Sequence, residues 1–300
     1  MNLITNPLDQ NIELGKVTWL RDYDEALAES KTTNKPVLLF FQEIPGCSTC
    51  VNYGREVLSH PLMVELIENE FVPLAIYNNK PGKDAEILKR YDEMSWNNPV
   101  TRFVDSNGID IAGKLANNYH PLGLYNKIID VLIGLNKDIP KYAKLLEGDL
   151  KIKHGIASTT IFETPCFWSG ETSFAQFPAV FSTEAGWIGH KEVVKIYYDK
   201  ELASVYDLNA FAEMQGFYTT DKHETYRIDE DPQFYLKKTD YKYLPLSPSQ
   251  RTKINYAIPY KADPESFLSP KQKALLHKEN LKNLKPIYSS DIESAWMLSN

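Results

Sequence analysis

The chain has 300 residues, of which 43% are apolar and 24% charged, the composition of a globular protein long enough for two domains. Its net charge of −7 excludes the basic footprint that a nucleic-acid backbone requires, so we expect no nucleic-acid partner. The N-terminus lacks a basic, apolar leader, and the longest apolar run is far too short to cross a bilayer. These features predict a cytoplasmic protein with no membrane partner.

The three cysteines lie in two motifs. Cys47 and Cys50 share the stretch Pro45-Gly46-Cys47-Ser48-Thr49-Cys50, whereas Cys166 stands directly before Phe167-Trp168. A close Cys-x-x-Cys pair in a cytosolic chain indicates either a redox centre or a metal site. A zinc site would need two further ligands, and the sequence has no second Cys-x-x-Cys and no His-x3-His. We therefore favour a redox pair without metal or cofactor, with a metal site and a relic pair as the alternatives.

The first half of the chain alternates predicted strands and helices. Residues 37–41 form a continuous apolar run, rich in β-branched and aromatic residues, that predicts a strand buried on both faces. Further strands are predicted over 71–77, 98–105 and 109–115, and helices over 23–31, 51–69 with a break near Pro61, 84–91 and 121–135. With the cysteine pair between the first buried strand and its helix, this order predicts an α/β domain over residues 1–136.

Residues 17–135 resemble the thioredoxin fold, with Cys47-Ser48-Thr49-Cys50 at the place of the family's redox pair. The stretch from Ile44 to Cys50 also resembles a thioredoxin-like group in which the first redox position can be selenocysteine. The resemblance implies that Pro99 is the cis-proline beside the active site and part of the substrate-binding surface. At a helix N-terminus the Cys47 thiolate would be stabilised, and Cys50, one turn later, could close the disulfide.

A polar, lysine-rich segment follows the first domain. We expect residues 137–153 to be a linker and residues 154–300 to form a second domain. In that second part, strands are predicted over 157–162, 179–187 and 193–199, and helices over 167–177 and 205–213. Tyrosine-rich residues 218–300 contain two helix starts, at Ser247 and Ser269, and are expected to cover the second domain.

Three ordered blocks of the second half resemble peptide methionine sulfoxide reductase of the A type, which implies an α+β domain. The blocks are Pro165-Cys166-Phe167-Trp168-Ser169-Gly170-Glu171, Pro178 to Trp187, and Gly189-His190-Lys191-Glu192 continuing to Asp199. By this resemblance Cys166 is the nucleophile that attacks the sulfoxide sulfur, and Glu192 is the acid that protonates the oxygen. Phe167, Trp168 and Trp187 would bind the substrate, whereas Glu171 is expected to be structural.

The resemblance predicts a fused oxidoreductase. Attack on methionine S-sulfoxide, free or in a peptide, leaves a sulfenic acid on Cys166. Cys47 could attack that sulfenic acid, and Cys50 could resolve the resulting mixed disulfide. The expected partners are the sulfoxide substrate and an upstream thiol reductant such as a thioredoxin reductase system.

The second domain departs from the family in its tyrosines. Gly186-Trp187-Ile188-Gly189-His190 joins two blocks directly, without the segment that carries a family tyrosine for the sulfoxide oxygen. Tyr235 and Tyr241 are candidates to supply a hydroxyl instead. The alternative function is a thiol–disulfide oxidoreductase whose degenerate second domain only binds a client. That alternative predicts a Glu192 carboxylate remote from Cys166, whereas the reductase predicts that the two share a pocket.

Overall fold

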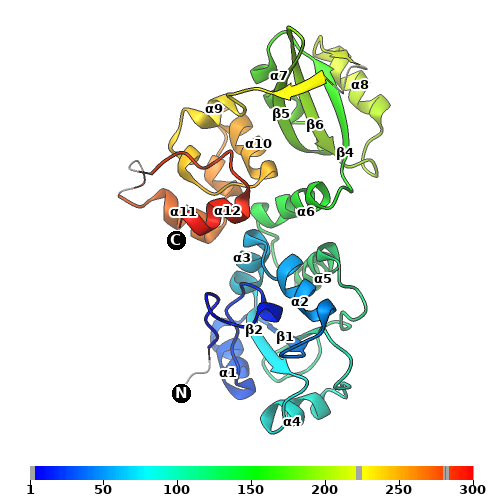
Figure 1. Ribbon diagram of the computed structural model, residues 1–300, viewed down its shortest axis with the longest axis vertical. Coiled ribbons are helices and arrows are strands. Elements are labelled where there is room, and N and C mark those ends of the chain that lie inside the picture. Colours follow the sequence, from blue (N-terminus) through cyan, green and yellow to red (C-terminus); the bar gives the residue numbers. More distant parts are fainter. Residues whose placement is uncertain (1–3, 221–224, 280, 282–283, 300) are drawn as a thin grey trace. The chain divides into compact units, whose positions relative to one another are not determined.

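The computed structural model describes residues 4–220, 225–279, 281 and 284–299. It divides into two compact units, Met1–Ile139 and Pro140–Asn300, and each unit is built around its own sheet (Figure 1). Among the described residues, no helix is both long and apolar enough to cross a membrane.

The N-terminal unit has a three-stranded sheet of order β2-β1-β3. The central strand β1 (Val37–Gln42) pairs in parallel with β2 (Val72–Tyr77) and antiparallel with β3 (Val100–Val104). All six residues of β1 are buried, as the continuous apolar run predicts for a strand covered on both faces. The carboxyl end of β1 leads directly into the segment that carries the cysteine pair.

Helices surround this sheet. The described ones are η1 (Ile12–Leu14), α1 (Tyr23–Thr33), α2 (Ser48–Glu56), α3 (Pro61–Glu70), α4 (Lys83–Arg90) and α5 (Pro121–Gly134). The break predicted near Pro61 is confirmed, because Pro61 begins α3, where its missing N–H costs no helical hydrogen bond.

The strand expected over residues 109–115 is wrong. Only two isolated bridges form there, Val104 with Asp110 and Thr101 with Leu115. Residues 109–115 are exposed or half-buried, so no apolar face holds them in a ladder. Ion pairs from Arg102 to Asp110 and from Lys114 to Glu93 attach the segment instead.

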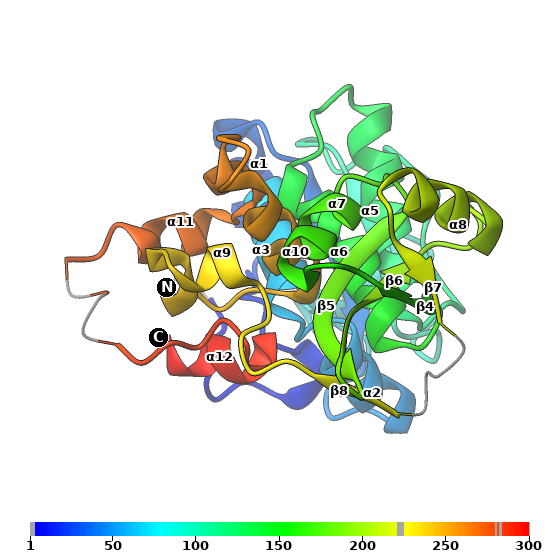
Figure 2. The same cartoon turned by 90° about the horizontal axis from the view of Figure 1, so that it is seen from above.

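The C-terminal unit has a five-stranded antiparallel sheet of order β7-β4-β6-β5-β8. Its long strands are β4 (Ser158–Glu163), β5 (Val180–Ile188) and β6 (Lys191–Tyr198). The short strands β7 (Tyr218–Thr219) and β8 (Tyr226–Ile228) form the edges, and β8 pairs with the last residues of β5 (Figure 2).

The helices of this unit belong to two apolar cores. One core joins α7 (Phe167–Phe174) and α8 (Val205–Met214) to the sheet through Phe162, Phe174 and Ile196. A second core, around Leu244, Leu246 and Ile254, lies within the C-terminal helical part. That part contains α9 (Phe234–Lys237), η3 (Asp240–Tyr243), α10 (Pro248–Ala257), η4 (Pro264–Phe267), α11 (Pro270–Leu276) and α12 (Ile292–Leu298).

The linker expected over residues 137–153 is corrected by the structure. The two units divide between Ile139 and Pro140, and residues 141–153 form α6 (Lys141–Lys153), which packs on α10 and β5 within the C-terminal unit. Its buried residues Tyr142, Ala143, Leu146 and Leu150 recur at helical spacing. This apolar stripe, rather than the intervening lysines, determines the structure of the segment.

Candidate redox site

Cys47 and Cys50 are free thiols at the start of α2, with their Sγ atoms 3.5 Å apart. Cys47 is the N-cap residue and is exposed, whereas Cys50 lies one turn later and is fully buried. The exposed Cys47 thiol can contact a substrate, whereas the buried Cys50 thiol can reach Cys47. The pair therefore has the geometry of an attacking cysteine and a resolving cysteine.

The two thiols differ in acidity. A hydrogen bond from the backbone N–H of Cys50 lowers the pKa of Cys47, because it stabilises the thiolate of Cys47. Burial, together with the charge of Cys47, raises the pKa of Cys50 to about 12. At neutral pH the pair therefore offers Cys47 as its nucleophile.

Asn98 and Pro99 approach the pair from the loop before β3. The Asn98-Pro99 peptide bond is cis, as the resemblance implies, and the Sγ atom of Cys50 donates to Oδ1 of Asn98 at 2.8 Å. The role of Asn98 is not apparent from the sequence, where its signal is its position directly before Pro99. A second cis bond, Ile44-Pro45, was not expected either.

The loop before Cys47 is held by buried polar contacts. The backbone N–H of Gly46 donates to Oε1 of Glu13 at 2.7 Å, and Glu13 is only 4% exposed. A Cβ atom on Gly46 would lie 2.5 Å from the Cβ atom of Cys50, so only glycine allows the loop to approach this closely.

One metal-ligand cluster includes the pair. Glu43, Cys47 and Cys50 place ligating atoms within 4.8 Å of one another. A structural zinc site takes four protein ligands, and in the part of the chain that the structure describes this cluster has three. The cluster fits thiol chemistry better than a closed zinc site.

Cys166 is the N-cap residue of α7 and is half-buried. Glu192, near the start of β6, reaches the same helix end, where its Oε2 atom accepts the backbone N–H of Phe167 at 2.8 Å. The hydrogen bond from the N–H of Thr164 to the carbonyl oxygen of Glu192 brings the chain before Cys166 alongside β6. Gly170 lets α7 approach β6 closely, because a Cβ there would lie 2.8 Å from Val194.

Phe167, Trp168 and Trp187, which are expected to bind the substrate, form one cluster of aromatic rings. Phe167 lies edge-on to Trp168 and Trp187, with ring centroids 5.7 and 5.2 Å away, and Trp187 pairs across the sheet with Glu192. Two further residues fix these rings: Phe234 stacks on Trp168 at 3.7 Å, and Asp229 accepts the indole N–H of Trp187 at 2.8 Å. No sequence motif marks either of the two.

These rings line an open pocket of about 420 Å³. Its lining consists of Phe167, Trp168, Trp187 and residues 227–231. Cys166, Glu192, Tyr235 and Tyr241 are not among those residues, so a pocket shared by Cys166 and Glu192 stays a prediction. Tyr235 lies against the ring of Phe234, and Tyr241 packs on the C-terminal helical core, where burial raises its pKa to about 12. Their role as hydroxyl donors stays a prediction.

Glu171 lies in the interior, apart from the lining of this pocket. Its carboxyl group is fully buried and accepts backbone N–H groups of Ala185 and Gln233, so it ties α7 to β5 and to the start of α9. Burial raises its pKa to about 8.

Comparisons with known proteins agree with the N-terminal geometry. A Thioredoxin-like family model matches residues 18–106. The thioredoxin-related protein DsbJ of Chlamydia pneumoniae is 26% identical over 90 residues, which are 30% of this chain and only 26% of that relative. The chain thus spans about a quarter of the length of the curated relative that it matches.

Two solved structures are also similar. A DsbH oxidoreductase is 22% identical with a TM-score of 0.34, over 44% of this chain and 94% of the other. A thioredoxin from Thermus thermophilus is 24% identical with a TM-score of 0.33, over 38% and 85% of the two chains. From the family match and the thiol geometry we conclude that the chain carries an N-terminal thioredoxin-like domain, the fold of thiol–disulfide oxidoreductases.

Proposed function

We propose that the chain reduces methionine S-sulfoxide at Cys166 and that the Cys47–Cys50 dithiol restores Cys166 after each turnover. The observation that supports this proposal is the hydrogen bond from the N–H of Phe167 to Glu192, because Phe167 directly follows Cys166 in the chain. A thiolate and an acid are the two groups that the reaction needs. A remote Glu192 would have favoured the alternative.

The chemistry proceeds in three balanced steps. The Cys166 thiolate attacks the sulfoxide sulfur while Glu192 protonates the oxygen, and the products are the thioether and a sulfenic acid on Cys166. The Cys47 thiolate then attacks the sulfur of the sulfenic acid and releases its hydroxyl group, which leaves as water after taking a proton from solvent, and a Cys47–Cys166 disulfide forms. Cys50 attacks the sulfur of Cys47, releases the Cys166 thiolate and leaves a Cys47–Cys50 disulfide for an external thiol reductant.

The aromatic pocket supports the proposal at the substrate end. Phe167, Trp168 and Trp187 offer an apolar wall for the methyl group of the sulfoxide. The sulfur atom of a thioether-like group also packs favourably against aromatic rings.

A second function is favoured by the absence of a tyrosine from the residues that line this pocket. In that case the C-terminal unit binds a client whose disulfide is reduced by Cys47 and Cys50 alone. Cys166 then takes no part in turnover.

The experiment compares three proteins in two assays. With dithiothreitol as reductant, Cys166→Ser should abolish reduction of N-acetylmethionine S-sulfoxide, whereas Cys47→Ser should retain it. In the insulin disulfide assay, the dependence should reverse, because only Cys47 attacks there. Sulfoxide turnover that survives in Cys166→Ser, or is absent from the unmodified chain, would refute the proposal and leave the second function.

A trapping experiment tests the recycling step. In Cys50→Ser the mixed disulfide has no resolving thiol, so sulfoxide treatment should accumulate a Cys47–Cys166 disulfide that tryptic mass spectrometry detects. The same treatment of the Cys47→Ser variant is the control and should leave Cys166 as a sulfenic acid that dimedone labels.

A further inference from the structure

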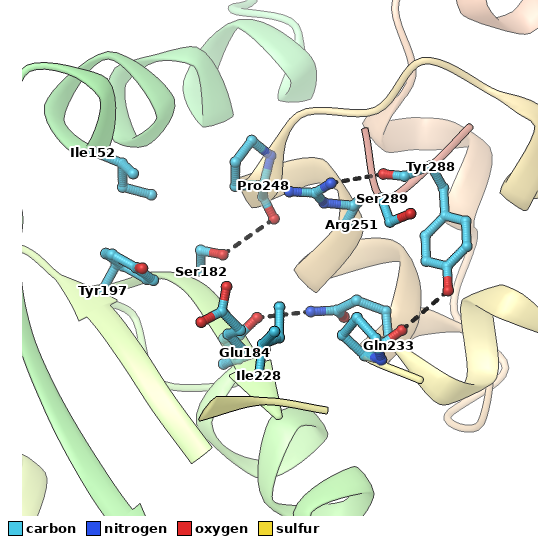
Figure 3. Close-up of a pocket in the computed structure, with 12 residues that line it drawn as sticks. Ile152, Ser182, Glu184, Tyr197, Ile228, Gln233, Pro248, Arg251, Tyr288 and Ser289 are labelled. Atoms are coloured by element: carbon cyan, nitrogen blue, oxygen red, sulfur yellow. Dashed lines mark hydrogen bonds between the residues drawn. The ribbon is translucent and has the colours of Figure 1, made fainter. Parts of the chain in front are cut away.

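A second cavity lies in the C-terminal unit, and Ile228 lines both this cavity and the pocket that Trp187 lines. It has a volume of about 170 Å³, and residues of β5, α6, α10 and the chain before α12 line it (Figure 3). Ser182 and Glu184 contribute from β5, and side chains two residues apart on a strand share a face.

Two charged residues line this cavity, Arg251 from α10 and Glu184 from β5, and the other ten lining residues are uncharged. Figure 3 shows their side chains extending from the helix and from the sheet into the same space. The described lining therefore offers one cationic group and one anionic group.

Arg251 is held in place but lacks a direct counter-ion. Its Nη1 atom donates to the carbonyl oxygens of Tyr288 at 2.7 Å and Ser290 at 3.4 Å, which fixes the guanidinium plane. Asp149, Glu184 and Asp291 act on it at longer range, but among the described residues no carboxylate forms an ion pair with it. Arg251 is half-buried, and the fork geometry of its guanidinium group suits a carboxylate.

Glu184 has one oxygen engaged and one available. Its Oε1 atom accepts the hydroxyl of Tyr226 at 2.8 Å, which anchors the carboxylate at the side of the cavity. No hydrogen bond to its Oε2 atom is recorded in the described part of the chain. The free oxygen is positioned to accept a hydrogen bond from a cationic donor such as an ammonium group.

The remaining walls restrict the ligand further. Ile152, Ile228, Pro248 and the ring of Tyr197 contribute apolar surface to the lining. The volume of about 170 Å³ admits a small molecule and not a peptide or nucleotide. A phosphate would face repulsion from Glu184, and an amine without a carboxylate would face repulsion from Arg251.

We propose that this cavity is a binding site for a free α-amino acid with an aliphatic side chain, whose carboxylate binds Arg251 and whose ammonium group binds Glu184. The site is separate from Cys166, so it acts as a ligand-sensing or allosteric site and goes beyond the proposed function. It requires no covalent step.

The test is calorimetric titration of the full chain carrying Cys166→Ser with L-leucine, L-methionine and L-alanine. We expect one of them to bind, and 4-methylpentanoate and isoamylamine, which each lack one charge of leucine, to bind at least about tenfold more weakly, ~1.4 kcal/mol. Inorganic phosphate should not compete. Absence of binding by all three amino acids at millimolar concentration would overturn the proposal, as would equal affinity for the singly charged analogues.

Two substitutions identify the site. Glu184→Gln keeps an acceptor for Tyr226 but removes the charge, and Arg251→Lys keeps the charge but removes the fork. Each should weaken binding of the amino acid at least about tenfold, whereas the matched charge change Glu213→Gln on exposed α8 should not. Unchanged affinity in Glu184→Gln would refute the assignment even if Arg251→Lys failed to fold.

Discussion

Replacement of Asn98 by alanine should make the Cys47–Cys50 pair a stronger reductant. The Sγ atom of Cys50 donates to Oδ1 of Asn98 at 2.8 Å, and only the dithiol has a proton to donate. In the disulfide the amide oxygen loses this donor. The contact therefore stabilises the reduced state, and its removal should lower the reduction potential.

The magnitude follows from the energy of one neutral hydrogen bond. Such a bond contributes about 1 kcal/mol net, and for a two-electron couple about 1.4 kcal/mol corresponds to about 30 mV. The Asn98→Ala substitution should therefore lower the potential by about 20 mV, within a range of roughly 10–30 mV.

The potential can be measured by equilibration with glutathione buffers, followed by alkylation and mass spectrometry. Cys166→Ser serves as the background so that only one pair titrates. Asn97→Ala is the control, because the bond from Cys50 goes to Asn98 and not to its neighbour. A potential that rises in Asn98→Ala, or shifts equally in Asn97→Ala, would refute the reasoning.

Three further predictions concern reactivity and stability. Iodoacetamide at pH 7 should modify Cys47 well before Cys50. Cys47 is exposed and has a lowered pKa, whereas burial raises the pKa of Cys50 to about 12. Peptide mass spectrometry that shows Cys50 labelled first would contradict this prediction. Gly46→Ala should destabilise the N-terminal unit by about 1–3 kcal/mol through overpacking, as measured by hydrogen exchange of the β1 amides. The control Gly134→Ala should not destabilise the unit, because a Cβ atom at Gly134 would meet open space. Burial raises the pKa of Glu171 from 4.5 to about 8, so the folded state holds a proton that the unfolded chain releases; this contribution to stability is complete below pH 4.5 and is lost as pH rises towards 8. Glu171→Gln should remove a slope of up to ~1.4 kcal/mol per pH unit from the pH dependence of the unfolding free energy of the C-terminal unit, measured by chemical denaturation. An unchanged slope would count against the raised pKa of Glu171.

Elements whose signal is local could be predicted from the sequence. The apolar run 37–41 is a strand buried on both faces, and Cys47 and Cys166 both cap helices, because these features depend on composition and on short spacing. The cis bond at Asn98-Pro99 also followed from a motif. The expected strand over 109–115 does not form, because these residues are exposed or half-buried and have no buried apolar face to hold a ladder.

Contacts between residues far apart in the chain could not be predicted and are seen only in the tertiary structure. The carboxyl group of Glu192 reaches the end of α7 because β6 runs beside β4, and Asn98 reaches Cys50 because β3 returns beside β1. Each of these contacts joins residues at least 25 positions apart, and no local periodicity encodes such a distance. The cavity between Arg251 and Glu184 has the same origin, since the packing of α10 against β5 creates it.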